Sequence, residues 1–201
     1  MINNIKIYKQ SSVKMDNIYI DPYGIDEVLN DAKYIFITHS HYDHYSTEDI
    51  DKIINDNTIF IMPLSMKDDY KYSNKALFVE PGNTYKIDDI EFSTIAMYNI
   101  NKQFHKKEYN WCGYNIKYNN ELYYFVGDSD DTEEIRSVEC NYIFIPIGGT
   151  YTMDLDEAIN ALSYIKYDYV IPYHYGSIVG DISLGNKLKE VIGDRCIVKI
   201  K

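Results

Sequence analysis

Short apolar runs separated by polar turns dominate the chain and predict a strand-rich protein. Runs of three to eight residues rich in Ile, Val, Tyr and Phe, bounded by Asn, Asp, Gly or Pro, are typical of β-strands. The first two runs are separated by a polar turn. We expect strands over residues 5–8, 18–20, 34–37, 58–62, 77–80, 84–87, 90–97, 112–118, 122–126, 142–147, 169–171 and 196–200.

Helices are predicted where capping residues precede apolar positions at helical spacing. Ser46 with Asp49, and Asp154 with Glu157, have the spacing of capping boxes, and a helical apolar stripe follows the second pair. Asp130 with Glu133 would cap a third, short helix. The remaining polar stretch at 99–110 is expected to be a loop. We predict helical segments over 26–30, 47–54, 64–72, 130–138, 154–165 and 184–192, within one α/β domain spanning residues 1–201.

Composition narrows the classes of partner. The 201 residues carry a formal net charge of −11, whereas binding a nucleic-acid backbone requires a basic face. Lys102, Lys106 and Lys107 do cluster, but we interpret them as a solvated loop. We therefore expect a small-molecule partner and no nucleic acid, and the sequence leaves the oligomeric state open.

Cysteine usage and hydropathy indicate the compartment. Cys112, Cys140 and Cys196 are isolated from one another, which favours reduced, partly buried thiols in a reducing environment. The amino-terminal residues lack the apolar core of a signal peptide, and no apolar run approaches the ~18 residues of a membrane span. We expect a cytoplasmic protein with no membrane contact.

Three of the five histidines fall in one short stretch, which reads His39-Ser40-His41-Tyr42-Asp43-His44. The stretch follows the apolar run 34–37. His39 and His41 are two apart, so on extended backbone both point to one side and can hold one metal ion. Asp43 and His44 come where the chain must turn, which lets them face a second ion. Imidazole and carboxylate at this density suit zinc or another divalent transition metal.

Further candidate ligands follow other apolar strands. Asp128 comes after the run 124–126 through Gly127, and His174 follows the run 169–171. Taken alone, a histidine such as His174 is more often a hydrogen-bonded core or surface residue, and Gly-Asp is usually a turn. Beside the histidine run, both gain weight as ligands, because loops at the carboxyl ends of strands converge in α/β sheets.

In this order and spacing, the residues from Asp21 to His174 resemble the metallo-β-lactamase-fold hydrolase superfamily. The tract that contains Tyr98 to Lys102, His105 and Trp111 to Tyr114 looks like a small bacterial branch of it. The resemblance implies a four-layer αββα sandwich, with two divalent metal ions at one edge of its two sheets. Zinc is the expected metal, with manganese or iron as alternatives.

The resemblance also implies a role for each candidate. The first metal would be held by His39 and His41 and the second by Asp43, His44 and His174, with Asp128 bridging the two and Asp21 hydrogen-bonding the histidine loop. One feature departs from the superfamily. It usually takes a third histidine directly after a mid-chain strand, but here Ala96 to Asn99 follow Ile95, and the available histidine is His105. Either the loop folds back to deliver His105, which we favour, or the first metal lacks a ligand and His105 lies near the pocket.

Two such metals would lower the pKa of a bridging water from ~15.7 towards ~7 and make hydroxide available at neutral pH. The predicted function is therefore metal-dependent hydrolysis of a small-molecule ester, lactone or phosphodiester, with Asp43 and Asp128 as candidate catalytic residues. Redox members of the superfamily usually carry glutamate where His41 stands, which favours hydrolysis here. Two alternatives stay open: a metal-dependent nuclease acting on nucleic acid, and a metal-binding structural or sensing protein without turnover.

Overall fold

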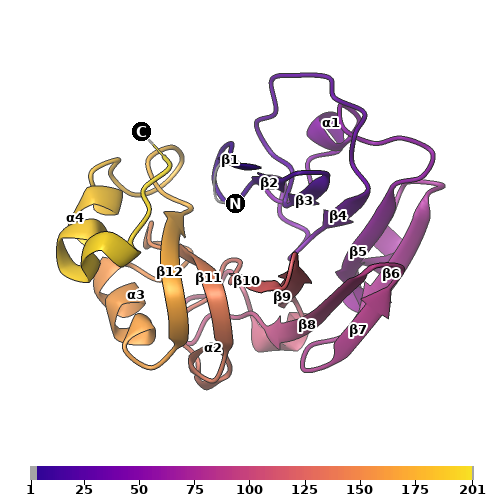
Figure 1. Cartoon of the computed structure of the whole chain (residues 1–201). Helices are drawn as coiled ribbons and strands as arrows, with labels where there is room; N and C mark the ends of the chain where they lie inside the picture. Colours follow the sequence, from indigo (N-terminus) through magenta and orange to yellow (C-terminus); the bar gives the residue numbers. More distant parts are fainter. Residues whose placement is uncertain (1–3, 201) are drawn as a thin grey trace. The chain divides into compact units, whose positions relative to one another are not determined.

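The computed structural model describes residues 4–200, so the predicted domain limits, residues 1 and 201, lie outside the described residues. The chain divides into two compact units, Met1–Val79 and Glu80–Lys201. Each contains one six-stranded mixed sheet with helices (Figure 1). This confirms an α/β chain, whereas a single domain over 1–201 stays a prediction.

The first unit is built on a sheet with the strand order β1-β2-β3-β4-β5-β6. β2 pairs antiparallel with both β1 and β3, and β3 to β6 run parallel. The helical elements of this unit are α1 (Thr47–Ile50) and the 3₁₀ helix η2 (Leu64–Asp69). The strands are β1 (Ile5–Ile7), β2 (Val13–Met15), β3 (Ile18–Ile20), β4 (Tyr34–Phe36), β5 (Ile59–Pro63) and β6 (Lys75–Val79).

Alternate residues of the parallel strands form the core of the first unit. Ile35 and Phe60 project from the sheet into a buried cluster with Ile50 of α1, Ile53 and Met66 of η2. Because side chains alternate across a strand, this one face of the sheet fixes the register of β4 and β5. Burial of these side chains holds β4 firmly at the base of the histidine loop.

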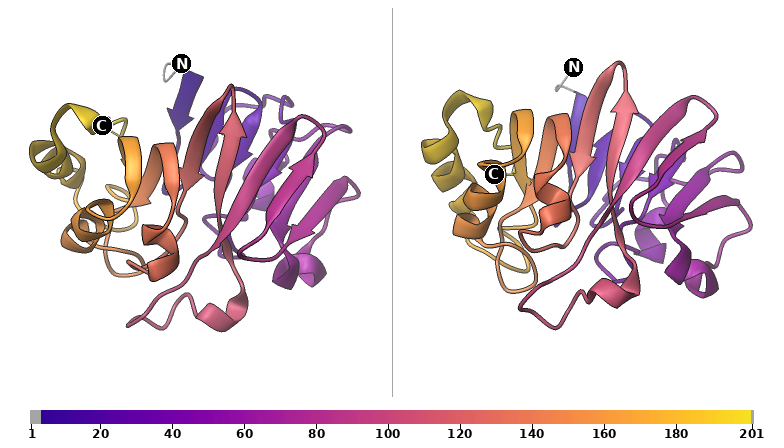
Figure 2. Two further views of the ribbon diagram at one scale, coloured as in Figure 1. Left: turned by 60° about the horizontal axis from the view of Figure 1, so that its bottom comes forward. Right: turned by 90° about the horizontal axis from the view of Figure 1, so that it is seen from below.

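The second unit carries the sheet β12-β11-β10-β9-β8-β7 (Figure 2). β7 to β10 form antiparallel neighbours, and β10, β11 and β12 are parallel. The strands are β7 (Thr84–Ile87), β8 (Ile90–Ala96), β9 (Cys112–Tyr118), β10 (Glu121–Phe125), β11 (Glu139–Pro146) and β12 (Lys166–Tyr173). The helices are α2 (Glu133–Arg136), α3 (Leu155–Leu162) and α4 (Leu184–Ile192), with 3₁₀ turns η3 (Lys107–Tyr109) and η4 (Gly193–Arg195).

One face of this second sheet is covered by helices. Ile143 and Val170 of the parallel strands are buried in one cluster with Ile135 of α2, Ala158 of α3 and Leu188 of α4. The helical apolar stripe predicted from Asp154 onwards is therefore the face of α3 that packs on the sheet. Asp154 and Glu157 form the predicted capping box at its start.

Strand direction brings selected loops of each unit to one edge. β8 and β10 are both antiparallel to β9, and β12 runs parallel to β10 through β11, so β8, β10 and β12 all point the same way. The residues that follow them therefore meet at one edge of the second sheet. In the first unit, β3 and β4 are parallel neighbours, which brings Asp21 beside the start of the histidine loop.

Two predictions in the first forty residues are wrong. Val13–Met15 forms strand β2 between the two expected strands, where we predicted a polar turn. Residues 26–30 are not helical. Asn30 adopts a left-handed backbone conformation with φ of 49°, and the backbone N–H groups of Leu29 and Asn30 donate to the Lys52 carbonyl, outside any helix.

Two predicted helix starts also differ in detail. Ser46 does cap α1, but the Asp49 carboxylate accepts from Gly24 and Lys52 instead of completing a capping box, and regular α-helix ends at Ile50. The third helix is capped by Thr132, not by Asp130.

The other differences concern length and type. Residues 64–69 form a 3₁₀ helix in place of a longer helical segment over 64–72. The expected strand at 196–200 reduces to a single bridge between Cys196 and Val170. All three cysteines are free thiols, and they are buried, whereas we expected partial burial. Among the described residues, no helix is long and apolar enough to cross a membrane.

Candidate metal centre

The histidine loop of the first unit turns immediately after β4. The backbone N–H groups of His44 and Tyr45 both donate to the His41 carbonyl, at 3.0 and 2.9 Å, so the backbone curls at His41. Extended backbone is therefore the wrong reason for pairing His39 with His41. Their rings nevertheless meet, with Nε2 of His39 3.0 Å from Nδ1 of His41.

Asp21 holds this loop from the neighbouring strand end. Its carboxylate accepts from the backbone N–H of Thr38 at 2.7 Å, from the Thr38 hydroxyl at 2.7 Å and from Nδ1 of His44 at 2.8 Å. Complete burial raises the pKa of Asp21, and His44 and Thr38 oppose that shift. The predicted hydrogen bonding of the histidine loop by Asp21 is thus present in the structure.

These contacts decide where the ring protons lie. The Thr38 hydroxyl gives its single proton to Asp21, so its oxygen accepts from Nδ1 of His39 at 2.9 Å. Likewise, Nδ1 of His44 donates to Asp21. In a neutral imidazole the other nitrogen then carries the lone pair. Nε2 therefore carries the lone pair in both His39 and His44.

The lone-pair nitrogen of His44 faces a carboxylate. Nε2 of His44 lies 3.8 Å from Oδ2 of Asp43, which also lies 3.5 Å from Nε2 of Gln10. His44 is buried, and the Asp43 side chain is 13% exposed. The first unit therefore gathers four of the predicted ligands, His39, His41, Asp43 and His44, within a single turn of chain.

The second unit gathers the other three predicted ligands. Oδ2 of Asp128 lies 3.1 Å from Nε2 of His174 and 3.5 Å from Nε2 of His105. All three residues are buried. The loop after β8 folds back to bring His105 beside Asp128, which is the geometry we favoured. Whether His105 coordinates a metal stays a prediction.

The backbone is left-handed at Gly127, directly before Asp128, and at His174 itself. Gly127 has φ of 73°, and its N–H donates to the hydroxyl of Tyr173 at 2.7 Å. His174 itself has φ of 53°, a left-handed conformation that is uncommon outside glycine and concentrates at functional sites. A side chain at Gly148 would collide with the His174 carbonyl, so only glycine fits there.

The donor chemistry of both units fits a divalent metal. In tetrahedral zinc sites, ligand atoms lie about 2.0–2.2 Å from the ion and hence roughly 3.3–3.5 Å from one another. The His39–His41 and Asp128–His105 separations are 3.0 and 3.5 Å, close to that spacing. At His44 and Asp43 a lone-pair nitrogen also faces an anionic oxygen, an arrangement that a cation between them stabilises.

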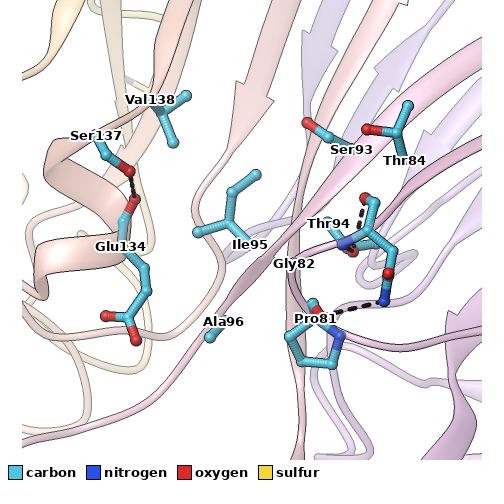
Figure 3. A pocket seen from close by; sticks show the side chains of 11 residues that line it. Pro81, Gly82, Thr84, Ser93, Thr94, Ile95, Ala96, Glu134, Ser137 and Val138 are labelled. Carbon is cyan, nitrogen blue, oxygen red and sulfur yellow. Dashed lines mark hydrogen bonds between the residues drawn. The ribbon is translucent and has the colours of Figure 1, made fainter.

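A groove of about 400 Å³ on the second unit is a different feature (Figure 3). It lies between α2 and the β7–β8 hairpin and is lined by residues such as Thr84, Ile95 and Glu134. None of the predicted ligands lines it. The candidate site is therefore defined by its ligand chemistry and not by this groove.

Four positions have structural roles that the sequence analysis does not assign: Thr38, Asn99, Gly148 and Tyr173. Thr38 directly precedes His39, and Asn99 precedes the loop that carries His105, so adjacency to a candidate ligand was an available signal. Tyr173 and Gly148 act through contacts with distant residues, for which the sequence holds no signal.

Comparison with known proteins identifies the family of this chain. The family described as "Beta-lactamase superfamily domain" matches residues 7–174. The chain belongs to this superfamily. A UPF0173 metal-dependent hydrolase of Nanoarchaeum equitans is 30% identical over 172 residues, which cover 81% of this chain and 77% of that protein. This chain is therefore also similar to a protein that is named as a metal-dependent hydrolase.

Solved structures share the fold of this chain. A protein of Parabacteroides distasonis superposes with a TM-score of 0.83 at 24% identity, covering 98% of this chain and 93% of its own. A metallo hydrolase of the archaeon Ignicoccus hospitalis has a TM-score of 0.77 at 20% identity, covering 98% and 94%. The predicted metallo-β-lactamase fold and enzyme class, metal-dependent hydrolase, are confirmed. Assignment to a bacterial branch stays a prediction.

Proposed function

We propose that this superfamily member hydrolyses a small-molecule ester, lactone or phosphodiester with two divalent metal ions, zinc being the expected metal. The two ligand groups, His39, His41, Asp43 and His44 from the first unit and His105, Asp128 and His174 from the second, would together hold these ions. The observation that carries the proposal is the superfamily match over residues 7–174, because that span contains every one of these ligands.

The residues of this chain would bind and orient the reacting groups. Bound divalent ions supply a water of lowered pKa and polarise the substrate oxygen. Thr38 and Asp21 keep the protons of His39 and His44 on Nδ1, so that Nε2 of each ring would be the atom that holds an ion. Oδ2 of Asp128 lies near Nε2 of both His105 and His174, and Asp128 would bridge the two ions.

The net charge of −11 supports a small substrate. A nuclease must approach a polyanion, which this charge opposes. Failure to bind RNA at any salt concentration would agree with a small substrate. Salt-sensitive RNA cleavage would favour the nuclease alternative instead.

The test combines metal analysis with turnover. Elemental analysis of protein purified without added metal should show zinc approaching two ions per chain. Protein loaded with zinc or manganese should cleave a member of an ester, lactone and bis-aryl-phosphate panel. His41→Ala and Asp128→Asn should each lose bound metal and abolish cleavage, because each removes a ligand.

A matched control separates ligation from general damage. Asp168→Asn changes a carboxylate on β12 of the same unit, where it accepts from Asn141, and should leave metal and turnover unchanged. Full turnover in His41→Ala or Asp128→Asn would contradict the proposal. Stoichiometric metal with no turnover across the panel would favour a structural or sensing protein.

A further inference from the structure

The loop that carries His105 closes on a single side chain, Asn99. The backbone N–H of Asn99 donates to the His105 carbonyl at 2.6 Å. In return, Oδ1 of Asn99 accepts from the backbone N–H of His105 at 3.1 Å and lies 2.9 Å from its ring Nδ1. Both residues are buried. One asparagine thus fixes the backbone and the ring of the same histidine.

The orientation of the Asn99 amide is set by its other neighbours. Its Nδ2 donates to Oδ1 of Asp130 at 3.1 Å and to the carbonyl of Tyr151 at 3.0 Å. Both are acceptors, whereas the backbone N–H of His105 can only donate. Reversing the amide would place NH₂ against a donor and oxygen against two acceptors. The oxygen must therefore face His105.

This orientation determines the tautomer of His105. An amide oxygen has no proton to give, so Nδ1 of His105 must carry the proton of their shared hydrogen bond. In the neutral ring Nε2 then holds the lone pair, and it is Nε2 that lies 3.5 Å from Oδ2 of Asp128. The ring is consequently preset with its coordinating atom towards Asp128.

Asp130 anchors the asparagine. Its carboxylate also accepts from Nζ of Lys102 at 2.5 Å and from the backbone N–H of Ile100 at 2.8 Å. Lys102 in turn reaches Glu157 of the α3 capping box at 3.2 Å. Asp130 and Asp128 lie on the same short segment after β10, so one stretch of backbone carries both the anchor of Asn99 and the carboxylate that faces His105.

We propose that Asn99 is a positioning residue that holds His105 as its Nδ1–H tautomer and aims Nε2 at Asp128. The consequence for metal binding rests on the proposed function, because it requires His105 to be a ligand. The tautomer of His105 itself does not depend on the proposed function. Any loss of metal affinity should therefore accompany a change in the His105 ring that is measurable without metal.

The decisive measurement is the tautomer of His105 in metal-free protein. Long-range ¹H–¹⁵N correlation spectra of histidine-labelled protein distinguish Nδ1–H from Nε2–H, and a chain with five histidines gives few signals. Wild-type His105 should be Nδ1–H. Asn99→Leu, which keeps the shape but removes the acceptor, should shift it towards Nε2–H or a mixture. Asn99→Ala, which also removes the acceptor, should shift it in the same direction.

Metal binding supplies the second readout. Zinc affinity of Asn99→Leu, measured by competition with a chelator, should fall about 10–100-fold, the usual effect of removing a partner that orients a ligand. Asn115→Leu is the matched control, since Asn115 is a similarly buried asparagine on β9 that donates to Glu139. It should alter neither tautomer nor affinity.

The results separate this proposal from the proposed function. Wild-type His105 in the Nε2–H form, or an unchanged tautomer in Asn99→Leu, would overturn the role of Asn99. An equal effect of Asn115→Leu would do so as well. If Asn99→Leu does not fold, the wild-type and Asn99→Ala spectra decide. Wild-type protein that binds no zinc would defeat the proposed function while leaving the tautomer result intact.

Discussion

At the scale of single residues, proton placement prepares the histidines for coordination. Nδ1 of His39 donates to the Thr38 hydroxyl, and Nδ1 of His44 donates to Asp21. His105 is held in the same way by Asn99. In each case a fixed acceptor keeps the proton away from Nε2, so folding alone would select the tautomer that metal ligation by Nε2 requires.

Removing the Thr38 hydroxyl tests this arrangement. Thr38→Val keeps the side-chain shape but leaves Nδ1 of His39 without its acceptor and Asp21 without one donor. We expect zinc affinity to fall about 10–100-fold and the free energy of unfolding to fall by about 1–3 kcal/mol. Thr38→Ser, which retains the hydroxyl, should stay near wild type. Zinc competition and urea unfolding measure the two effects, and wild-type affinity in Thr38→Val would show that the hydroxyl does not orient His39.

Acid should release the metal through the same histidines. An imidazole must be neutral to coordinate, and the usual histidine pKa is about 6.5. As pH falls below about 6, protons compete for the coordinating nitrogens, so metal content should drop. Elemental analysis after dialysis at several pH values measures this. Metal content that stays constant down to pH 5 would argue against histidine ligation.

The proposed ligands and one of their supports, Asp21, were predictable from sequence, but the other supports were not. The run from His39 to His44 is specific because imidazoles and a carboxylate rarely gather so densely without a metal. Thr38 and Asn99 have only the weak signal of adjacency to a candidate ligand or to the loop that carries one. A threonine or asparagine beside a loop is ordinary, and its function depends on which side chains it meets after folding.

At the scale of elements, the chain places ligands at strand ends. β8, β10 and β12 run in one direction, so the segments carrying His105, Asp128 and His174 leave the same edge of the second sheet. Apolar runs predicted these strands well, because strands that pack against helices must carry buried apolar side chains. The prediction failed where local contacts override pattern, as at Leu29 and Asn30, whose backbone N–H groups donate to the Lys52 carbonyl and not within a helix.

In the first unit, Asp49 of α1 links its helix to the segment that follows β3. Its carboxylate accepts from the backbone N–H groups of Gly24 and Ile25, at 2.9 and 3.0 Å, and from Lys52 at 2.8 Å. This ties the segment after β3 to α1. Burial raises the pKa of Asp49, but hydrogen bonds from Lys52, Ser46 and the backbone outweigh burial, and the net pKa lies below its usual value.

Asp49→Asn should therefore destabilise the protein in a pH-dependent manner. The folded pKa is below the unfolded value of about 3.9, so the carboxylate contributes fully above that pH and its contribution disappears as pH falls through the folded pKa. We expect a loss of about 1–3 kcal/mol at pH 7, with the difference from wild type shrinking below pH 4. Urea unfolding at both pH values measures it. Asp56→Asn, at an exposed position, should have little effect, and a pH-independent loss in Asp49→Asn would contradict the charge-based account.

At the scale of the whole molecule, the proposed ligands are divided between two compact units, with His39 to His44 in one and His105, Asp128 and His174 in the other. Neither group alone supplies the two-metal set that the superfamily resemblance implies. Membership of the superfamily was predictable because the ligand motif is far more specific than any single element. The substrate was not, because nothing in the ligand set distinguishes an ester from a phosphodiester.

Metal removal should consequently destabilise the entire fold. A ligand that binds only the folded state at 1,000 times its dissociation constant adds about 4 kcal/mol to the free energy of unfolding. For a chain of this size that corresponds to a melting temperature about 8–16 °C higher. Calorimetry before and after chelation, with zinc added back, should show a fall and a recovery of this order. The triple variant His41→Ala, Asp128→Asn, His174→Ala has lost ligands of both units, so its melting temperature should not respond to chelator or zinc. A wild-type protein with proven zinc content that melts identically with and without the metal would show that the ions do not bind preferentially to the folded state, and ligation by both units would then be untenable.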